Sequence, residues 1–222
     1  GDWVLRMANG YSGRANSASP LRRGAELDPD LLGFVEALYR QHDLPPCVRI
    51  TPLAAEGARA LIEAAGFRIR DRSAGMLASL ESFAAPADAE LLLHRAPIIE
   101  WIGGVASHQT GAKRNAAALA AIVRGIRLPA AFAMLVSGGR TLAYGLAVAE
   151  RGMVDISSVI VDEAFRGRGV GRRLVTGLMG WAQALGCREI VLQVERGNEA
   201  AFKLYDSLGF REIYGYETWV KD

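Results

Sequence analysis

The sequence has few of the residues that hold stapled or metal-bound folds together. Its 222 residues include only two cysteines, Cys47 and Cys187, and three histidines. The cysteines lie far apart and lack the close spacing of metal ligands, which argues against a disulfide scaffold and against a cysteine-rich zinc site. They are expected to be buried thiols in a reducing compartment, so the predicted location is cytoplasmic.

Long apolar runs are missing as well. No stretch of about 18 apolar residues occurs, so the sequence predicts no transmembrane helix. No signal peptide is recognisable at its start. The chain begins Gly1-Asp2-Trp3 without an initiator methionine, which leaves open whether residues upstream of Gly1 are missing.

There is no excess of one charge. Lys and Arg number 26 against 24 Asp and Glu, for a net charge of +2, so any basic site must be local. No platform of aromatic and basic residues accompanies the arginines, and neither nucleic acid nor membrane is an expected partner. Hydrophobic residues make up 50% of the chain, which is enough for a sizeable core.

The second half of the chain carries clear strand patterns. A hairpin is expected from strands at 131–136 and 142–149, joined by the turn Ser137-Gly138-Gly139-Arg140. The remaining β-branched and aromatic segments predict strands at 155–161, at 189–195 and, as one or two strands, at 210–220.

Helices are expected between these strands. Apolar residues recur at helical spacing from Gly171 to Leu185, and a shorter helix is capped by Asn198 and ends at Gly209. Earlier, segments 89–108 and 113–126 look helical, and Ala84-Ala85-Pro86-Ala87-Asp88 is the best linker candidate. The predicted domains are therefore 1–84 and 89–222.

The chain resembles itself at an ungapped offset of 143 residues. Leu61-Ile62-Glu63-Ala64-Ala65-Gly66-Phe67-Arg68 aligns with Leu204-Tyr205-Asp206-Ser207-Leu208-Gly209-Phe210-Arg211. The alternative is coincidence between two alanine-rich stretches. If the repeat is real, the first copy starts in mid-repeat and differs at informative positions: Gly169 becomes Glu26, Gly171 becomes Asp28, Asn198 becomes Ala55 and Tyr205 becomes Ile62. Carboxylates in place of those glycines would repel phosphates, so the first copy is expected to keep the scaffold and lose the site.

A glycine- and arginine-rich segment stands between a predicted strand and a predicted helix. It reads Arg166-Gly167-Arg168-Gly169-Val170-Gly171-Arg172-Arg173. Glycines let backbone N–H groups converge, and a helix N-terminus adds free N–H groups and partial positive charge. Together with the arginines this pattern predicts a cradle for a pyrophosphate.

Two phosphate motifs do not fit this segment. The Walker A motif requires Gly-Lys-Ser/Thr, but Arg172 follows Gly171. The dinucleotide fingerprint requires a third glycine where Arg172 stands. The remaining alternative is a glycine-rich turn with exposed arginines.

The cradle resembles the acyl-CoA signature of the GNAT superfamily, Arg/Gln-x-x-Gly-x-Gly/Ala, at Arg166, Gly169 and Gly171. A second signature of that superfamily is similar to Leu192-Gln193-Val194-Glu195 followed by Asn198, Tyr205 and Gly209. The resemblance covers the C-terminal 130-odd residues. The first half resembles a degenerate copy, as in tandem GNAT proteins such as mycothiol synthase.

The resemblance implies an α/β fold, with a mixed, mainly antiparallel central sheet flanked by helices and preceded by a partial GNAT-like domain. It also implies acetyl-CoA as cosubstrate and a set of binding residues. These are Val159, Ile160, Val161, Arg166, Gly167, Arg168, Gly169, Val170, Gly171, Arg172, Asn198 and Tyr205.

Several of these residues have implied roles. The backbone of Val159 to Val161 would bind pantetheine like an added strand, and nearby amides would stabilise the oxyanion. Asn198 would bond the cofactor arm or simply cap its helix. Tyr205 would protonate the departing thiolate, because a phenol pKa near 10 suits a thiol of about 8.5. Its alternative role is core packing.

The residues do not single out the group that deprotonates the amine. Glu150, Asp155 and Glu195 are candidates, and each could equally be an ordinary solvated carboxylate. His108 follows the first expected helix of the second domain, where acceptors approach in the superfamily, but a lone exposed histidine is the plainer interpretation. Trp101 could bind the acceptor or pack in the core.

The sequence therefore predicts an N-acetyltransferase that transfers an acetyl group from acetyl-CoA to a primary amine by direct attack in a ternary complex. A small-molecule amine is the expected acceptor, no metal is implied, and the protein is expected to be a monomer or homodimer. One alternative is a catalytically silent acyl-CoA-binding or regulatory module. Another is a structural tandem whose first half supplies a dimer interface.

Overall fold

The computed structural model describes residues 1–111 and 115–222. These residues form two compact units, and each unit is built from more than one segment of the chain. The first unit contains residues 1–75, 195–197 and 213–222, and the second contains residues 76–194 and 198–212. The domain boundaries predicted at residues 84 and 89 stay a prediction. The two compact units divide between Gly75 and Met76, within the strand Arg68–Ser79.

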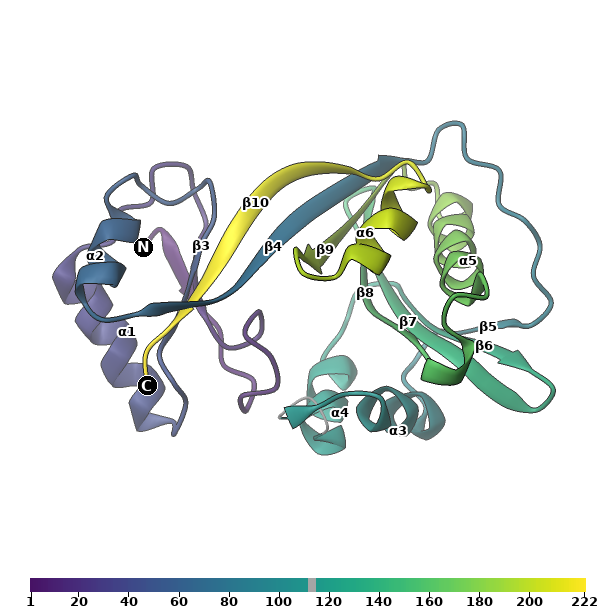
Figure 1. The fold of residues 1–222 in the computed structure, drawn as a ribbon, viewed down its shortest axis with the longest axis horizontal. Helices are drawn as coiled ribbons and strands as arrows, with labels where there is room; N and C mark the ends of the chain where they lie inside the picture. Colours follow the sequence, from purple (N-terminus) through teal and green to yellow (C-terminus); the bar gives the residue numbers. More distant parts are fainter. Residues whose placement is uncertain (112–114) are drawn as a thin grey trace. The chain divides into compact units, whose positions relative to one another are not determined.

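The first unit is a sheet with helices packed against it. Its elements are β1 (Trp3–Leu5), β2 (Ala18–Pro20), α1 (Pro29–Gln41), β3 (Cys47–Ile50), α2 (Ala58–Ala64), most of β4 (Arg68–Ser79) and most of β10 (Arg211–Val220). The strand order is β1-β2-β3-β10-β4 (Figure 1). Val35 and Tyr39 of α1, Ile62 of α2 and Trp219 of β10 meet in one buried cluster, so the C-terminal strand completes this core.

The second unit carries the motifs singled out in the sequence. Its elements are β5 (Leu91–His94), α3 (Ile99–Ser107), α4 (Ala116–Arg124), β6 (Ala130–Ser137), β7 (Arg140–Glu150), β8 (Met153–Val161), α5 (Val170–Ala184), β9 (Glu189–Glu195) and α6 (Glu199–Asp206). The strand order from the end of β4 is β4-β9-β8-β7-β6-β5, with β8 and β9 parallel and β5 to β8 antiparallel. This is the expected mixed α/β fold.

Helices cover both faces of this second sheet (Figure 1). Neighbouring residues of β7 point to opposite faces, as in any strand. The Tyr144 ring packs on Gly104 of α3, whereas a Cβ on Gly145 would lie 3.0 Å from Leu178 of α5. Helix α5 buries Leu174 and Leu178 completely, which explains the helical spacing of its apolar residues.

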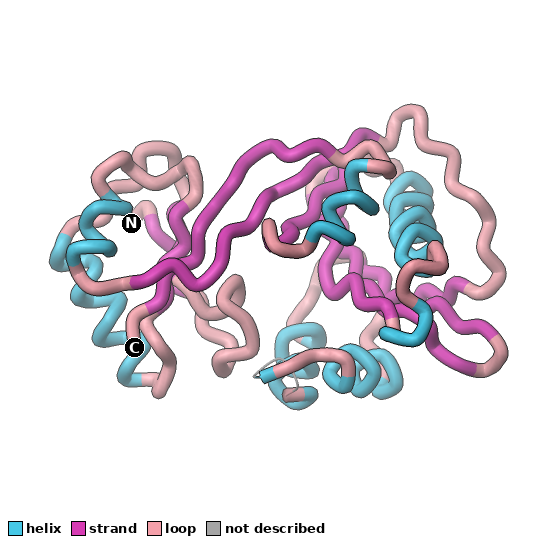
Figure 2. Tube along the Cα trace, in the orientation of Figure 1, coloured by secondary structure: helices cyan, strands magenta, loops and turns pink. Residues whose placement is uncertain are grey.

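Most of the expected elements are present, including the hairpin of β6 and β7. The helix expected over 89–108 is wrong in its first part, because Leu91–His94 is a strand that pairs with Leu135–Phe132. Pro97 also disfavours a helical conformation at the residue before it, so α3 starts only at Ile99. Segment 210–220 forms one strand. The expected start at Lys113 lies outside the described residues, and segment 84–88 is loop (Figure 2).

Elements recur along the chain at the offset found in the sequence. When 143 is added to the residue numbers of the first unit, the range of α1 falls within that of α5. The range of α2 then overlaps that of α6, and the range of β4 overlaps that of β10. Backbone conformations recur too. Gly24 and Gly167 have φ of 76° and 73°, and Gly66 and Gly209 have φ of 87° and 85°.

None of the helices in the described part of the chain is both long enough and apolar enough to cross a lipid bilayer.

The contact between α3 and β7 generates a stability prediction. A methyl group on Gly104 would collide with the Tyr144 ring, whereas the exposed neighbouring Gly103 has no atom near the site of its missing Cβ. Gly104→Ala is therefore expected to lower the free energy of unfolding by about 1–3 kcal/mol. Gly103→Ala should be neutral or stabilise by up to about 1 kcal/mol, since alanine is the better helix former. Urea denaturation of both variants measures the difference, and equal stabilities would contradict the predicted close packing.

Candidate functional site

The parallel strands β8 and β9 pair along only part of their length. Their register runs from Met153 opposite Glu189 to Ile156 opposite Leu192. Beyond these residues β8 continues to Val161 and β9 to Glu195, but the pairing stops. The backbone of Ser157–Val161 therefore loses its neighbour on this side, and these five residues are half-buried. An extended ligand could hydrogen-bond to such a strand edge.

A bulge in β8 lies at the start of this unpaired segment. Tyr144 pairs with Ile160 and Leu146 with Ser157, so two residues of β8 stand opposite Gly145 alone. Ser158 has a φ of 52°, a left-handed conformation that is rare outside glycine. The bulge turns backbone groups of β8 away from the regular ladder, at the place where the strand lacks a partner on its other side.

The glycine-rich segment forms the loop that enters α5. Gly167 and Gly169 have φ of 73° and 76°, and Gly169 is the N-cap with no side-chain cap. Both positions are open around the missing Cβ, so the backbone conformation is the reason for glycine there. The N–H of Arg173 bonds the Gly169 carbonyl at 3.1 Å, and the amides before it form the uncapped first turn. This geometry suits an anion.

Three of the arginines lie around this loop. The Nε of Arg166 lies 3.4 Å from the Val161 carbonyl, and its guanidinium is mostly exposed. Arg168 lies over the ring of Phe165, at 5.8 Å from the centroid. Arg172 donates to Ser207 Oγ at 2.6 Å. Their positive charge stays close to the loop amides.

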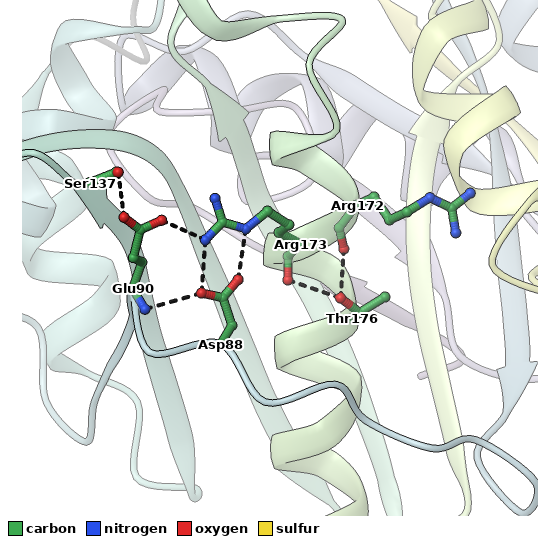
Figure 3. Close-up of polar contacts among 6 residues, drawn as sticks. All are labelled: Asp88, Glu90, Ser137, Arg172, Arg173 and Thr176. Atoms are coloured by element: carbon green, nitrogen blue, oxygen red, sulfur yellow. Dashed lines mark hydrogen bonds and ion pairs between the residues drawn. The ribbon is translucent and has the colours of Figure 1, made fainter.

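Arg173 serves a different purpose from the one expected of it. Its guanidinium donates to Asp88 at 2.8 Å through two nitrogens and to Glu90 at 2.7 Å, while Glu90 accepts a further bond from Ser137 (Figure 3). Two carboxylates neutralise the Arg173 charge, so this charge is not offered to a ligand of the cradle. We call the cluster of Arg173, Asp88 and Glu90 the tie, because it links two segments of the chain. The tie fixes the first turn of α5 to the segment that leads into β5.

The tie also shifts the acidity of its members. Hydrogen bonds from Arg173 hold the pKa of the Asp88 carboxyl below its usual value, and the hydrogen bond from Ser137, followed by that from Arg173, lowers the pKa of Glu90. The two carboxylates in turn raise the pKa of Arg173. All three groups are charged in the folded protein at neutral pH.

Helix α6 closes the other side of the loop. A Cβ on Gly171 would lie 3.2 Å from Leu204 of α6 and 3.5 Å from Val161 of β8, so glycine allows the three elements to meet. Asn198 caps α6 by accepting from the Ala201 N–H at 3.1 Å. Tyr205 is 6% exposed, and its ring lies 5.7 Å from that of Phe210.

The three candidate carboxylates are not equivalent. Asp155 is exposed and lies two residues before Ser157, so strand alternation puts both on one face of β8 at the end of the pairing with β9. Glu195 ends β9 and is exposed. Glu150 stands at the hairpin between β7 and β8, with a side chain 61% exposed and 3.8 Å from Arg151. The structure does not bring Glu150 to the unpaired segment.

The two aromatic candidates also differ. Trp101 is fully buried, donates to the Gly145 carbonyl at 3.1 Å and packs edge-on against Phe132, so it belongs to the core. His108 is partly exposed, with its ring 5.6 Å from that of Tyr144 and its Nε2 3.7 Å from Asp162. Asp162 is not among the site residues predicted from the sequence, although a carboxylate directly after a strand is a signal that could have pointed to it.

The region of the first unit that lies 143 residues earlier in the chain has no such opening. Ala18 pairs directly with Val48, whereas Val161, at this offset from Ala18, lies beyond the end of the β8–β9 pairing. The Ala25 N–H, at the position of Arg168, donates to the Leu53 carbonyl at 3.0 Å. Asp28 caps α1 by accepting from Leu31. Backbone hydrogen bonds therefore fill the place where a ligand would pair.

Comparisons with known proteins agree with this geometry. The model of a family described as "Probable histone acetyltransferase Rv0428c C-terminal" matches residues 1–218. The chain belongs to this family. It is an acetyltransferase of the GNAT superfamily.

Relatives and solved structures show how far the likeness extends. The chain is 24% identical over 225 residues to the uncharacterized N-acetyltransferase YobR of Bacillus subtilis, covering 100% of the chain and 90% of that protein. The uncharacterized protein ML0378 of Mycobacterium leprae is 46% identical over 59 residues, which are 27% of this chain and 16% of that protein. The N-alpha-acetyltransferase RimI of Mycobacterium tuberculosis is 37% identical over 59 residues, 27% of this chain and 35% of that protein.

Two solved structures share the fold. A GCN5-related N-acetyltransferase from Kribbella flavida superposes with a TM-score of 0.71 at 14% identity, over 99% of this chain and 88% of that one. A tandem GNAT protein from the clavulanic acid biosynthesis pathway superposes with a TM-score of 0.63 at 16% identity, over 86% of this chain and 68% of that one. At these identities the likeness concerns the fold.

The tie at Arg173 yields a pH-dependent prediction. Asp88→Asn keeps the shape of the side chain but removes its charge, so the free energy of unfolding at pH 7 should fall by about 1 kcal/mol. Because folding lowers the Asp88 pKa, its stabilisation is full above about pH 4, the unfolded value, and is lost as pH falls through the folded one. The deficit should therefore shrink at about pH 3.

The measurement is urea denaturation at the two pH values. Glu163→Gln is the control. The Glu163 side chain is 88% exposed, and its ion pair with Arg166 is long, at 3.5 Å, so loss of its charge should leave the free energy of unfolding almost unchanged. A deficit for Asp88→Asn that is no larger than that of Glu163→Gln would show that the tie adds no stability.

Proposed function

We propose that this enzyme transfers an acetyl group from acetyl-CoA to a primary amine, by direct attack within a ternary complex in the second unit. The end of the β8–β9 pairing at Ile156 and Leu192, beside the cradle at Gly167–Gly171, is the observation that carries the proposal. A strand edge suits the amide-rich pantetheine arm, and an uncapped helix start suits the pyrophosphate.

The residues present fit this cosubstrate. The amides of Gly167 to Gly171 would hold the pyrophosphate, with Arg166, Arg168 and Arg172 adding positive charge. The backbone of Val159 to Val161 would pair with the pantetheine arm. Amides at the bulge around Ser158 would face the thioester carbonyl and stabilise the oxyanion that forms during attack. Asn198 caps α6 and could donate to the cofactor arm with its amide nitrogen, so both of its expected roles can hold.

Tyr205 is the proposed general acid. It lies on α6, one residue after Leu204, whose side chain contacts the cradle at Gly171. Its phenol would give a proton to the departing thiolate. Asp155 is the carboxylate best placed to receive the proton that nitrogen releases as the new bond forms, because it shares a face with Ser157.

The first unit is, in this proposal, a degenerate GNAT copy in a tandem arrangement. Its elements recur at an offset of 143 residues, and its glycines Gly24 and Gly66 keep the left-handed conformations of Gly167 and Gly209. Its counterpart of the opening is closed by the pairing of Ala18 with Val48. The likeness of this chain to the tandem GNAT protein of the clavulanic acid pathway supports the same arrangement.

A small-molecule amine is the proposed acceptor. Some relatives over about a quarter of the chain are named N-alpha-acetyltransferases, and one from Haemophilus ducreyi is named ribosomal protein bS18-alanine N-acetyltransferase. A protein N-terminus is therefore the second candidate. Both are primary amines, and competition between a panel of small amines and an alanine-initiated peptide separates them.

The cradle is tested by acetyl-CoA binding. Gly169→Glu with Gly171→Asp copies the first unit, places side chains on a left-handed backbone and against Leu204, and adds two negative charges. Calorimetry should give tight binding to the wild type and at least about ten-fold weaker binding to the double variant. The control Glu26→Gln with Asp28→Asn, in the first unit, should bind normally. An absence of binding to the wild type would overturn the proposed function.

The role of Tyr205 is tested by turnover. Tyr205→Phe should lower kcat about 100-fold, with acetyl-CoA affinity kept, because the leaving thiolate loses its proton donor. Tyr216→Phe is a matched control, since Tyr216 is equally buried at 5% exposure and has no proposed role in catalysis. Thiol release is the assay. Equal rates for both variants would return Tyr205 to a packing role.

A further inference from the structure

His108 is held in a defined orientation at the end of α3. Its Nδ1 lies 2.8 Å from the Gly104 carbonyl oxygen and 3.1 Å from Ser107 Oγ, whose hydroxyl donates to the same carbonyl at 2.8 Å. A carbonyl can only accept, so Nδ1 carries the hydrogen of the neutral ring. The lone pair is then on Nε2, the nitrogen that can take up a proton.

A carboxylate faces that nitrogen. Asp162 Oδ2 lies 3.7 Å from His108 Nε2, which is too long for a direct hydrogen bond. The other oxygen of Asp162 is already engaged, since it accepts from the Ala164 N–H at 2.9 Å. Two acceptors therefore face the same space, and their side chains are 26% and 24% exposed. A donor with several N–H groups can bond both.

The pair stands beside the strand proposed to hold the acyl donor. Asp162 directly follows Val161, and its N–H bonds the Leu142 carbonyl at 2.9 Å. The His108 ring packs against Tyr144 of β7, which pairs with Ile160 on the neighbouring strand β8. The titratable groups around His108 therefore come from the end of β8 and from β7, and Asp162 supplies the carboxylate that faces it.

We propose that His108 and Asp162 bind the acceptor as a protonated primary amine and that His108 Nε2 removes its first proton. Asp162 compensates the ammonium charge, and the Gly104 carbonyl keeps the lone pair of His108 on Nε2. This inference rests on the proposed function and deepens it, because it names the acceptor class as amines that are cationic in solution.

The protons balance in this scheme. The ammonium gives one proton to His108, and the freed lone pair of nitrogen forms the C–N bond at the thioester carbonyl. The nitrogen then gives its second proton to Asp155, the C–S bond breaks, and the sulfur receives a proton from Tyr205. The products are the amide and the free thiol, and solvent restores the three side chains. One proton is released per turnover.

The first test separates base catalysis from packing. His108→Gln should lower kcat about 100-fold and remove the acidic limb of the pH profile of kcat/KM. Affinity for acetyl-CoA should be unchanged. His42→Gln is the matched control, because His42 occupies the C-cap of α1 as His108 occupies that of α3. Imidazole added to His108→Ala should restore part of the activity.

The second test addresses the ammonium. Asp162→Asn keeps an oxygen for the Ala164 N–H but removes the charge, so KM for an alkylamine should rise at least about ten-fold. KM for a neutral aromatic amine should change little. Folding is checked by thermal unfolding, in which both variants should stay close to the wild type.

The possible results are distinct. An active wild type with a His108→Gln variant of unchanged rate and pH profile would overturn this inference and leave the acetyltransferase standing. A lower rate with an unchanged pH profile and no rescue by imidazole would assign His108 to packing, and would also overturn it. A wild type that binds acetyl-CoA but acetylates no amine in the panel would remove the proposed function together with the inference.

Discussion

The partial pairing of two parallel strands is the constraint on which the site depends. A regular ladder over the full length of β8 and β9 would satisfy the backbone groups that face each other across these two strands and leave none of them for a ligand. The pairing instead ends after Ile156 and Leu192. The bulge at Ser158 lies directly beyond this end of the pairing. Gly171 lets Leu204 of α6 approach the cradle near Val161, the last residue of β8. Binding by main-chain groups requires such a gap, and the contrast with the closed pair Ala18–Val48 shows how small the difference is.

The sequence predicts the cradle well because its determinants are local. Gly167 and Gly169 adopt left-handed backbone angles that only nearby residues dictate, and the helix that follows shows its apolar spacing directly. The partner of Arg173 could not be predicted in this way, because Asp88 is 85 residues distant. Nor could the strand at Leu91–His94, since a short apolar run becomes a strand or a helix according to the neighbour it finds, here β6. The pairing of His108 with Asp162 is likewise a product of tertiary structure.

Charge is used in two ways at the start of α5. Arg166, Arg168 and Arg172 remain near the loop with neutral or largely solvated partners, so their charge can act on an anion. Arg173 is saturated by Asp88 and Glu90. A run of arginines in a sequence is therefore not a measure of the positive charge offered to a ligand. The count depends on which side chains find carboxylates elsewhere in the fold.

The place of β10 has a consequence for how the protein is made. Its residues 213–222 belong to the first unit, where Trp219 joins the core formed with α1 and α2, and β10 pairs with β3. When residues 1–75 have left the ribosome, this strand has not yet been synthesised. The first unit therefore cannot complete its core, or pair the edge of β3, until residues 213–222 have been synthesised. Residues 1–75 are made before the second unit, but their core is completed only after most of the second unit has been made.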